Sequence, residues 1–336
     1  MPLDSGVVPP RIEAAAPGHD DTAPQPRPAP VCQVLSEPYA GLQAQALGLA
    51  EAAGLRPELR ELVACPPWNR IPARLWARPL RVTGLQADPV PALAIGVGGM
   101  GAAVGAALRC RGARVVQVQA PRMDPRRFDL VVVSRHDELT GPNVLVTRTA
   151  LHRATPERLA AAREAWLPRL AHLPRPLVAV LVGGSNGRFR LGPAEGGALA
   201  ARLAAMMARD RVGLAVTASR RTDPVVRAAL EAALRPLGAM VWDMTGENPY
   251  FGLLACADVI VATIDSVSMV SEAVATSAPV LLAALPGRSR RIGLFLRGLA
   301  GEGRVRPFEG RLEQWPARPL DDTAAAAEEM RRRLGL

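Results

Sequence analysis

Two carboxylates and three hydroxyl groups occur within eight residues, directly after the mostly apolar stretch 259–264. The residues are Asp265, Ser266, Ser268, Ser271 and Glu272. A helix turns about 100° per residue, so Asp265, Ser268 and Glu272 share one face. The amides and positive dipole of a helix N-terminus suit a phosphate, and a carboxylate two turns deeper suits a ribose diol. The pattern predicts a nucleotide site in which Asp265 or Ser266 caps the helix, with a solvated polar helix face as the alternative.

Three further loops in the same half of the chain are polar or rich in glycine and follow apolar stretches. They read GGSNGR (183–188), TASRRT (217–222) and MTGENPY (244–250). Each alone is compatible with an ordinary capping loop, but parallel sheets bind ligands outside the carboxyl ends of their strands, so we expect one shared site. Glycines let backbone amides approach a phosphate, arginines neutralise a diphosphate, and a tyrosine can flank a base. The predicted ligand-binding residues in these loops are Gly183, Gly184, Ser185, Arg220, Arg221, Asn248 and Tyr250.

A general base is predicted in the other half of the chain, within SRHDEL (134–139). Of the four histidines, only His136 stands at the end of a predicted strand, and Asp137 follows it. Either side chain is suited to accept a proton from an acceptor group. Adjacent side chains diverge, so the two do not form a dyad, and a loop of solvated charges is the alternative.

A glycine pattern in the first half, GVGGMG (96–101), matches the dinucleotide-binding motif G-x-G-x-x-G through Gly96, Gly98 and Gly101. The match follows a later strand rather than the first strand. The next strand ends in Gln119, where a carboxylate would bind the ribose of NAD. An NAD(P) site therefore stays as an alternative to glycines that serve close packing between helix and strand.

These loops are positioned by short apolar strands that alternate with helical segments. The predicted strands cover 31–35, 92–97, 113–119, 128–134 and 143–147, and then 176–184, 211–219, 238–242, 257–263 and 278–285. One intervening helix is predicted to start at Pro156 with Thr155 as its cap. Apolar strands that alternate with helices indicate parallel sheets covered on both faces. The predicted fold class is α/β, with two Rossmann-like domains whose parallel sheets face a cleft.

Composition divides the chain into four segments. Residues 1–30 contain eight prolines and few large apolar residues, which predicts a disordered leader. We predict an N-terminal Rossmann-like, acceptor-side domain over 31–168 and a C-terminal, nucleotide-binding one over 176–320. Residues 321–336 carry acids first and bases last, as a C-terminal helix favours.

Charge and cysteine usage exclude several classes of protein. The net charge is +10, and all 41 basic residues are arginine without a block of interleaved aromatics, which argues against nucleic-acid binding. The four cysteines lack metal-ligand spacing, which predicts no metal site and a reducing cytoplasm. No apolar run approaches the ~18 residues that span a bilayer, and no signal peptide is recognisable. We expect a cytoplasmic protein, at most peripheral to the inner membrane.

The segment CPPWNRIPARLWARPLR (65–81) interleaves large apolar residues with arginines. The large apolar residues are Trp68, Ile71, Leu75 and Trp76. The first three are spaced by three and four residues, and Trp76 directly follows Leu75. This spacing predicts an amphipathic helix that contacts a membrane surface or a lipid acceptor. The alternative is a segment whose tryptophans pack onto their own domain.

Four stretches of the chain resemble one known family. GENPYFGLLACADVIVATIDSVSMVSEA, TASRRT, SRHDELTGPNVLVT and QAPR are together similar to the mitochondrial fission (elongated-mitochondria) protein family, over nearly everything after residue 31. That family in turn resembles two-domain glycosyltransferases of the GT-B type. LVGGSNG and SMVSEA are similar to the donor loops of the peptidoglycan transferase that adds N-acetylglucosamine. The resemblance implies a nucleotide-diphosphate-sugar ligand, no tightly bound cofactor, and a site formed by Gly184, Ser185, Arg220, Asn248, Ser266, Ser268 and Glu272.

The chain departs from the family pattern in its first half. Leu42 replaces the histidine of a Gly-His-x-x-Gln motif that keeps Gln45, and Gly99 and Met100 replace two arginines.

Three hypotheses about function therefore remain. The first is metal-independent transfer of a sugar to an unknown, membrane-associated acceptor. The others are a non-catalytic adaptor that binds a membrane or partner, and an NAD(P)-dependent nucleotide-sugar epimerase.

Overall fold

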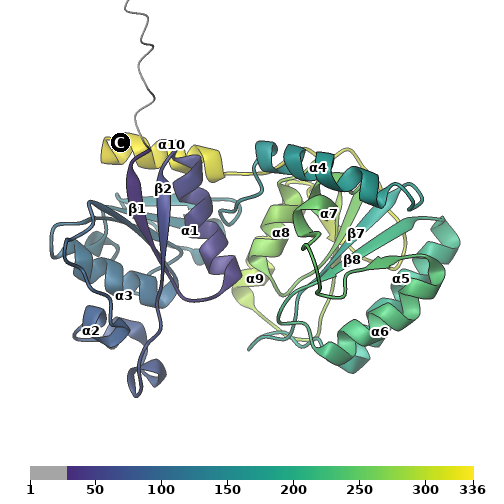
Figure 1. Cartoon of the computed structure of the whole chain (residues 1–336), viewed down its shortest axis with the longest axis horizontal. Helices are drawn as coiled ribbons and strands as arrows, with labels where there is room; N and C mark the ends of the chain where they lie inside the picture. The colour runs from purple at the N-terminus through teal and green to yellow at the C-terminus, as the bar shows by residue number, and fades with distance from the viewer. Residues whose placement is uncertain (1–28) are drawn as a thin grey trace, which may run out of the picture.

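The strands of the protein form two parallel sheets in a computed structural model that describes residues 29–336 (Figure 1). The first sheet has the order β2-β1-β3-β4-β5-β6 and the second the order β12-β11-β10-β7-β8-β9. The first comprises β1 Val31–Ser36, β2 Arg56–Glu61, β3 Leu93–Val97, β4 Arg114–Val118, β5 Leu130–Ser134 and β6 Val144–Thr147. The second comprises β7 Leu177–Val182, β8 Gly213–Ala218, β9 Met240–Val241, β10 Val259–Thr263, β11 Val280–Ala283 and β12 Val305–Pro307. The predicted α/β class with two Rossmann-like domains is confirmed.

Helices cover both faces of each sheet, and the central strands β3, β5, β7 and β10 are mostly apolar and bury every residue. The helices are α1 Ala40–Ala52, α2 Pro79–Thr83, α3 Gly98–Arg109, α4 Pro156–Leu170, α5 Pro193–Asp210, α6 Pro224–Leu234, α7 Tyr250–Cys256, α8 Val267–Val274, α9 Arg290–Gly301 and α10 Thr323–Leu334. Thr155 caps α4 as predicted, since its side chain accepts a hydrogen bond from the amide of Arg158.

Two edge strands and one helix lack a clear sequence signal. β2 reads RPELRE, so its charged residues give no apolar run, and β1 holds it in register through backbone pairing. β12 is only three residues long and pairs with β11. α9 carries arginines and glycines between its apolar residues, and only Phe295 and Leu299 are buried. Tertiary pairing, rather than local pattern, places all three.

The chain crosses between the domains twice. After β6 it crosses at 148–155, and α4 then packs in the second domain, where Trp166 and Leu170 share a core with Leu253 of α7. The predicted boundary after residue 168 therefore falls inside α4, because this helix continues through Pro168 to Leu170. The chain returns near residue 320, and α10 packs against α1 in the first domain (Figure 1). The predicted leader, 1–30, lies almost wholly outside the described residues.

The segment 65–81 forms no continuous amphipathic helix. It contains two short 3-10 turns, Trp68–Arg70 and Ala73–Leu75, before α2 begins at Pro79. Trp76 is buried beside Val82, and its indole N–H donates to the carbonyl of Ile71 at 3.0 Å. The prolines prevent a longer helix, so the predicted helical membrane face is wrong, although Leu75 remains 63% exposed. In the described part of the chain, every helix is too short or too polar to traverse a bilayer.

Candidate functional site

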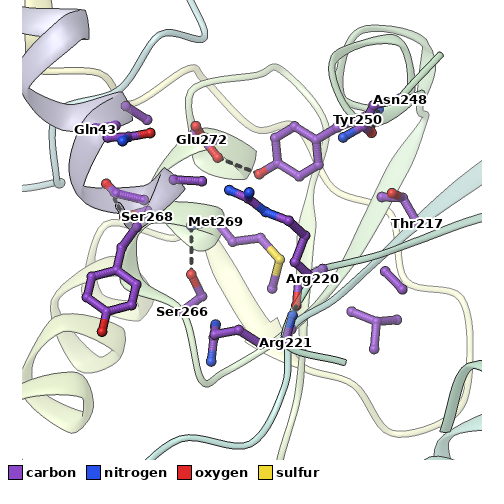
Figure 2. A pocket seen from close by; sticks show the side chains of 18 of the residues that line it. Gln43, Thr217, Arg220, Arg221, Asn248, Tyr250, Ser266, Ser268, Met269 and Glu272 are labelled. Atoms are coloured by element: carbon purple, nitrogen blue, oxygen red, sulfur yellow. Dashed lines mark hydrogen bonds between the residues drawn. The ribbon is translucent and has the colours of Figure 1, made fainter. Parts of the chain in front are cut away.

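A cleft of about 990 Å³ separates the two domains at the carboxyl ends of the second sheet (Figure 2). It is bordered by the residues after β7, β8, β9 and β10, by the start of α1, and by Arg153 of the crossing segment. The chain leaves β7 toward β8 on one side and β10 toward β11 on the other, so the crevice between β7 and β10 is a topological switch point. Such crevices hold the ligands of open α/β sheets.

Most of the predicted ligand-binding residues line this cleft. They are Gly183, Arg220, Arg221, Asn248, Tyr250, Ser266, Ser268 and Glu272. Three others, Gly184, Ser185 and Asp265, are not part of its lining. The fold therefore brings the four loops to one place, but it gives their side chains different tasks.

Ser266 is the cap of α8, since its hydroxyl accepts a hydrogen bond from the amide of Met269 at 3.3 Å. Of the two predicted caps, Asp265 and Ser266, the structure shows Ser266 in this role. Asp265 has another role. The face predicted for Asp265, Ser268 and Glu272 is interrupted, because Asp265 precedes the helix and points inward. Ser266 and the first turn of α8 remain at the cleft.

Asp265 joins three loops below the cleft. Its side chain is fully buried, and its carboxylate accepts hydrogen bonds from the amide of Gly184 at 3.0 Å, the hydroxyl of Thr263 at 2.7 Å and the guanidinium of Arg221 at 2.9 Å. A Cβ at Gly183 would lie 2.2 Å from Oδ1 of Asp265. This glycine therefore makes room for an internal carboxylate, and Asp265, which was predicted to contact a ligand, forms its hydrogen bonds within the protein.

Ser185 and Gly184 are likewise used by the scaffold. The hydroxyl of Ser185 accepts from the amide of Leu191 at 2.9 Å and donates to the carbonyl of the same residue at 3.2 Å. A Cβ at Gly184 would lie 2.2 Å from the carbonyl oxygen of Arg221. Both residues order the loop after β7, and neither reaches the cleft.

Glu272 and Tyr250 form a pair in the wall of the cleft (Figure 2). The tyrosine hydroxyl donates to Oε2 of Glu272 at 2.5 Å, and the carboxylate is only 7% exposed. Burial raises the pKa of Glu272 to about 7, which the hydrogen bond from Tyr250 and the charge of Arg158 partly oppose. Glu272 was predicted to bind a ribose, but one of its carboxylate oxygens already accepts the hydrogen bond from Tyr250. A bound ribose would therefore share this oxygen with Tyr250 or displace the tyrosine hydroxyl.

Ser268 connects the two domains. Its hydroxyl accepts from the side-chain amide of Gln45 at 3.0 Å and lies 3.3 Å from the carbonyl oxygen of Gly41, at the start of α1. Oε1 of Gln45 in turn accepts from Gln119 at 3.2 Å. Sequence reasoning gave Gln45 no role, and the only signal for it is that the family motif keeps this glutamine.

Arg220 supplies the free positive charge of the cleft. Arg153 and Arg221, which also line it, pair with Glu51 at 2.5 Å and Asp265 at 2.9 Å. Arg220 has no hydrogen bond or ion pair to another described residue, and its side chain extends toward Tyr250 and Glu272 (Figure 2). With a single carboxylate, Glu272, in its lining, the cleft favours an anion.

His136 and Asp137 lie away from this cleft, in the 3-10 turn Arg135–Asp137 that contacts α9. Asp137 pairs with Arg291, and the ring of His136 stands 5.3 Å from that of Phe295. Burial lowers the pKa of His136. His136 borders a separate cavity of about 320 Å³, so the structure does not bring the predicted base to the donor loops.

No group of three or more His, Cys, Asp or Glu side chains within residues 29–336 is placed to hold a metal ion. The glycines of the 96–101 motif serve packing. A Cβ at Gly96 would lie 2.7 Å from the carbonyl oxygen of Gly101, and one at Gly101 would lie 2.8 Å from that of Leu35.

Comparisons with known proteins agree with this architecture. A model of the family described as Mitochondrial fission ELM1 matches residues 40–334. The Mitochondrial fission protein ELM1 of Arabidopsis thaliana is 33% identical over 250 residues, which cover 66% of this chain and 58% of that protein. The chain thus spans little more than half the length of this plant relative.

Two solved structures share the fold at low sequence identity. The UDP-GlcNAc 2-epimerase from Neisseria meningitidis, bound to UDP-GlcNAc, aligns with a TM-score of 0.52 at 12% identity and covers 90% of each chain. UGT71G1 of Medicago truncatula, complexed with UDP-glucose, also gives 0.52 at 12% identity, over 90% of this chain and 93% of the other. The fold is therefore GT-B-like, as the sequence predicted.

Proposed function

The chain belongs to the mitochondrial fission ELM1 family, and from this premise we propose that its interdomain cleft binds a nucleoside-diphosphate sugar and supports transfer of the sugar to an acceptor hydroxyl. One observation carries the proposal. The loops after β7, β8, β9 and β10 border one cleft at the switch point of the second sheet, with an unpaired arginine and a carboxylate in its wall. UDP-sugars bound to proteins of the same fold support this ligand class.

The residues divide between the parts of such a ligand. The first turn of α8, capped by Ser266, would receive a phosphate, since Ser266, Ser268 and Met269 line the cleft at this helix N-terminus. Arg220 would neutralise charge that develops on the departing diphosphate. Glu272 would accept hydrogen bonds from the ribose, and the ring of Tyr250 would lie beside it.

We expect Arg220→Ala to weaken UDP binding by roughly ten- to a hundred-fold, because a charge-assisted hydrogen bond contributes about 1.5–3 kcal/mol. Isothermal titration calorimetry with UDP measures the effect. Arg188→Ala is the matched control, since Arg188 is exposed on the loop after β7 and outside the cleft lining. Wild-type protein without UDP affinity tighter than about a millimolar would refute the proposal and favour the non-catalytic adaptor.

The NAD(P)-dependent epimerase finds less support in the geometry. Gly98 opens α3, but Oε2 of Glu37 would lie 2.7 Å from a Cβ built on it. A carboxylate at this position repels the pyrophosphate that the motif would otherwise bind. Titration with NADP in the same calorimeter tests this alternative directly.

A membrane contact is proposed for the segment 63–78, in which Val63, Ile71 and Leu75 are 66%, 36% and 63% exposed. Arg70, Arg74 and Arg78 are exposed on the same segment, and no Asp or Glu occurs between Glu61 and Asp88. Exposed apolar side chains interspersed with arginines along one segment suit an anionic lipid surface, where the acceptor would be presented.

Replacing Ile71 and Leu75 together by alanine should lower pelleting with phosphatidylglycerol vesicles at least ten-fold, because each side chain would lose about 1–2 kcal/mol of apolar burial. Leu237→Ala, at a 49% exposed leucine of the second domain, is the control. Equal pelleting of the double variant and the wild type would remove this contact from the proposal.

A further inference from the structure

The first sheet has a switch point of its own. The chain leaves β1 toward β2 on one side and β3 toward β4 on the other, so the crevice lies between the carboxyl ends of β1 and β3. The residues that follow β1, from Pro38 to Gly41, line the large cleft opposite the loops of the second domain. The two switch points therefore open toward the same space. The function proposed above assigns no ligand to the crevice between β1 and β3.

Glu37 stands at this first switch point. It is the first residue after β1, and Pro38 and Tyr39 beside it line the cleft. Its carboxylate reaches the start of α3, where Gly98 has a φ of 73° and a Cβ would lie 2.7 Å from Oε2. Only glycine meets both conditions, a left-handed backbone and a close carboxylate.

The carboxylate of Glu37 is uncommitted. Among residues 29–336, no side chain or amide forms a hydrogen bond or an ion pair with it, unlike the carboxylates of Asp137, Asp265 and Glu272. Half-burial raises the pKa of Glu37, with desolvation as its cause and no arginine opposing it. A carboxylate without a partner and with raised basicity is suited to take a proton.

We propose that Glu37 is the general base of sugar transfer and that the crevice between β1 and β3 holds an acceptor hydroxyl. As the acceptor oxygen forms its bond to the anomeric carbon, Glu37 takes the hydroxyl proton. The bond from that carbon to the diphosphate oxygen breaks, and the nucleoside diphosphate leaves with the electron pair. This inference rests on the proposed function, because it requires a nucleotide sugar in the facing half of the cleft.

The test uses the full chain with UDP-N-acetylglucosamine or UDP-glucose and water as the acceptor, and follows release of UDP. Glu37→Gln should lower the release rate about a hundred-fold or more while the Kd for UDP stays within two-fold. Formate should restore part of the rate to Glu37→Ala, a rescue that a structural role would not give. Glu58→Gln, on the exposed edge strand β2, is the matched control.

Equal release rates in Glu37→Gln and wild type, including no release from either, would overturn the assignment of the base while UDP binding still supported the site. A loss of UDP binding in Glu37→Gln would also overturn it, because the base should not hold the nucleotide. Wild-type protein that fails to bind UDP would overturn the proposed function and this inference together.

Discussion

Replacing Asp265 by alanine is expected to destabilise the second domain by about 3 kcal/mol or more, the largest effect on stability at any residue of the site. The substitution leaves the amide of Gly184 and the hydroxyl of Thr263 without their buried acceptor, and it leaves Arg221 without its counter-charge. Each unsatisfied buried group costs about 1–3 kcal/mol. The loops after β7, β8 and β10 would lose their common anchor.

Urea denaturation followed by far-UV circular dichroism measures this loss. Glu247→Ala is the control, because Glu247 belongs to an exposed ion pair with Arg169 and should change stability by less than about 1 kcal/mol. Asp265→Asn should fall between the two, since it keeps one oxygen acceptor. A loss below about 1 kcal/mol in Asp265→Ala would show that the carboxylate does not hold the loops together.

Replacing Glu272 by glutamine is expected to stabilise the protein at alkaline pH while it weakens nucleotide binding. The carboxyl group has a pKa of about 7 in the folded chain and an ordinary value of 4.5. Between these values the folded state binds more protons than the unfolded state, so wild-type stability falls as pH rises from about 4.5 to about 7. Glutamine does not titrate and can still accept the hydrogen bond from Tyr250.

The expected difference is about 3 kcal/mol in favour of Glu272→Gln at pH 8 and close to zero at pH 4, where both side chains are neutral. Unfolding free energies measured in urea across this range test the sign. Glu231→Gln, at an exposed helical position, should show no such trend. A difference between Glu272→Gln and wild type that does not vary with pH would contradict burial as its cause.

A decrease in the free energy of unfolding caused by the buried, ionised Glu272 would be typical of a functional site. A carboxylate kept in a buried wall at an energetic cost is expected where a ligand uses it. Asp265 shows the opposite case, since its hydrogen bonds offset its burial within the protein itself. The two carboxylates are seven residues apart and have similar exposure, so their partners, not their burial, distinguish them.

The sequence alone determined which loops would meet. Apolar strands are recognisable one segment at a time, and in a parallel sheet every loop that follows a strand emerges at the same edge. Local capping chemistry is equally readable, as Thr155 and Ser266 show. These features depend on residues within a few positions of one another, so a single pattern contains them.

Only the tertiary structure decided what each side chain does. Ser268 meets Gln45, which is 223 residues away, and Asp137 meets Arg291, which is 154 residues away. Such partners make Ser268, a predicted ligand-binding residue, a contact between domains, and they make Asp137, a predicted base, half of an ion pair. Glu37 belongs to no sequence motif. It is recognised as a candidate base only from the structure, in which none of the described residues pairs with its carboxylate. Distant contacts of this kind arise from packing of the whole chain, which no local pattern contains.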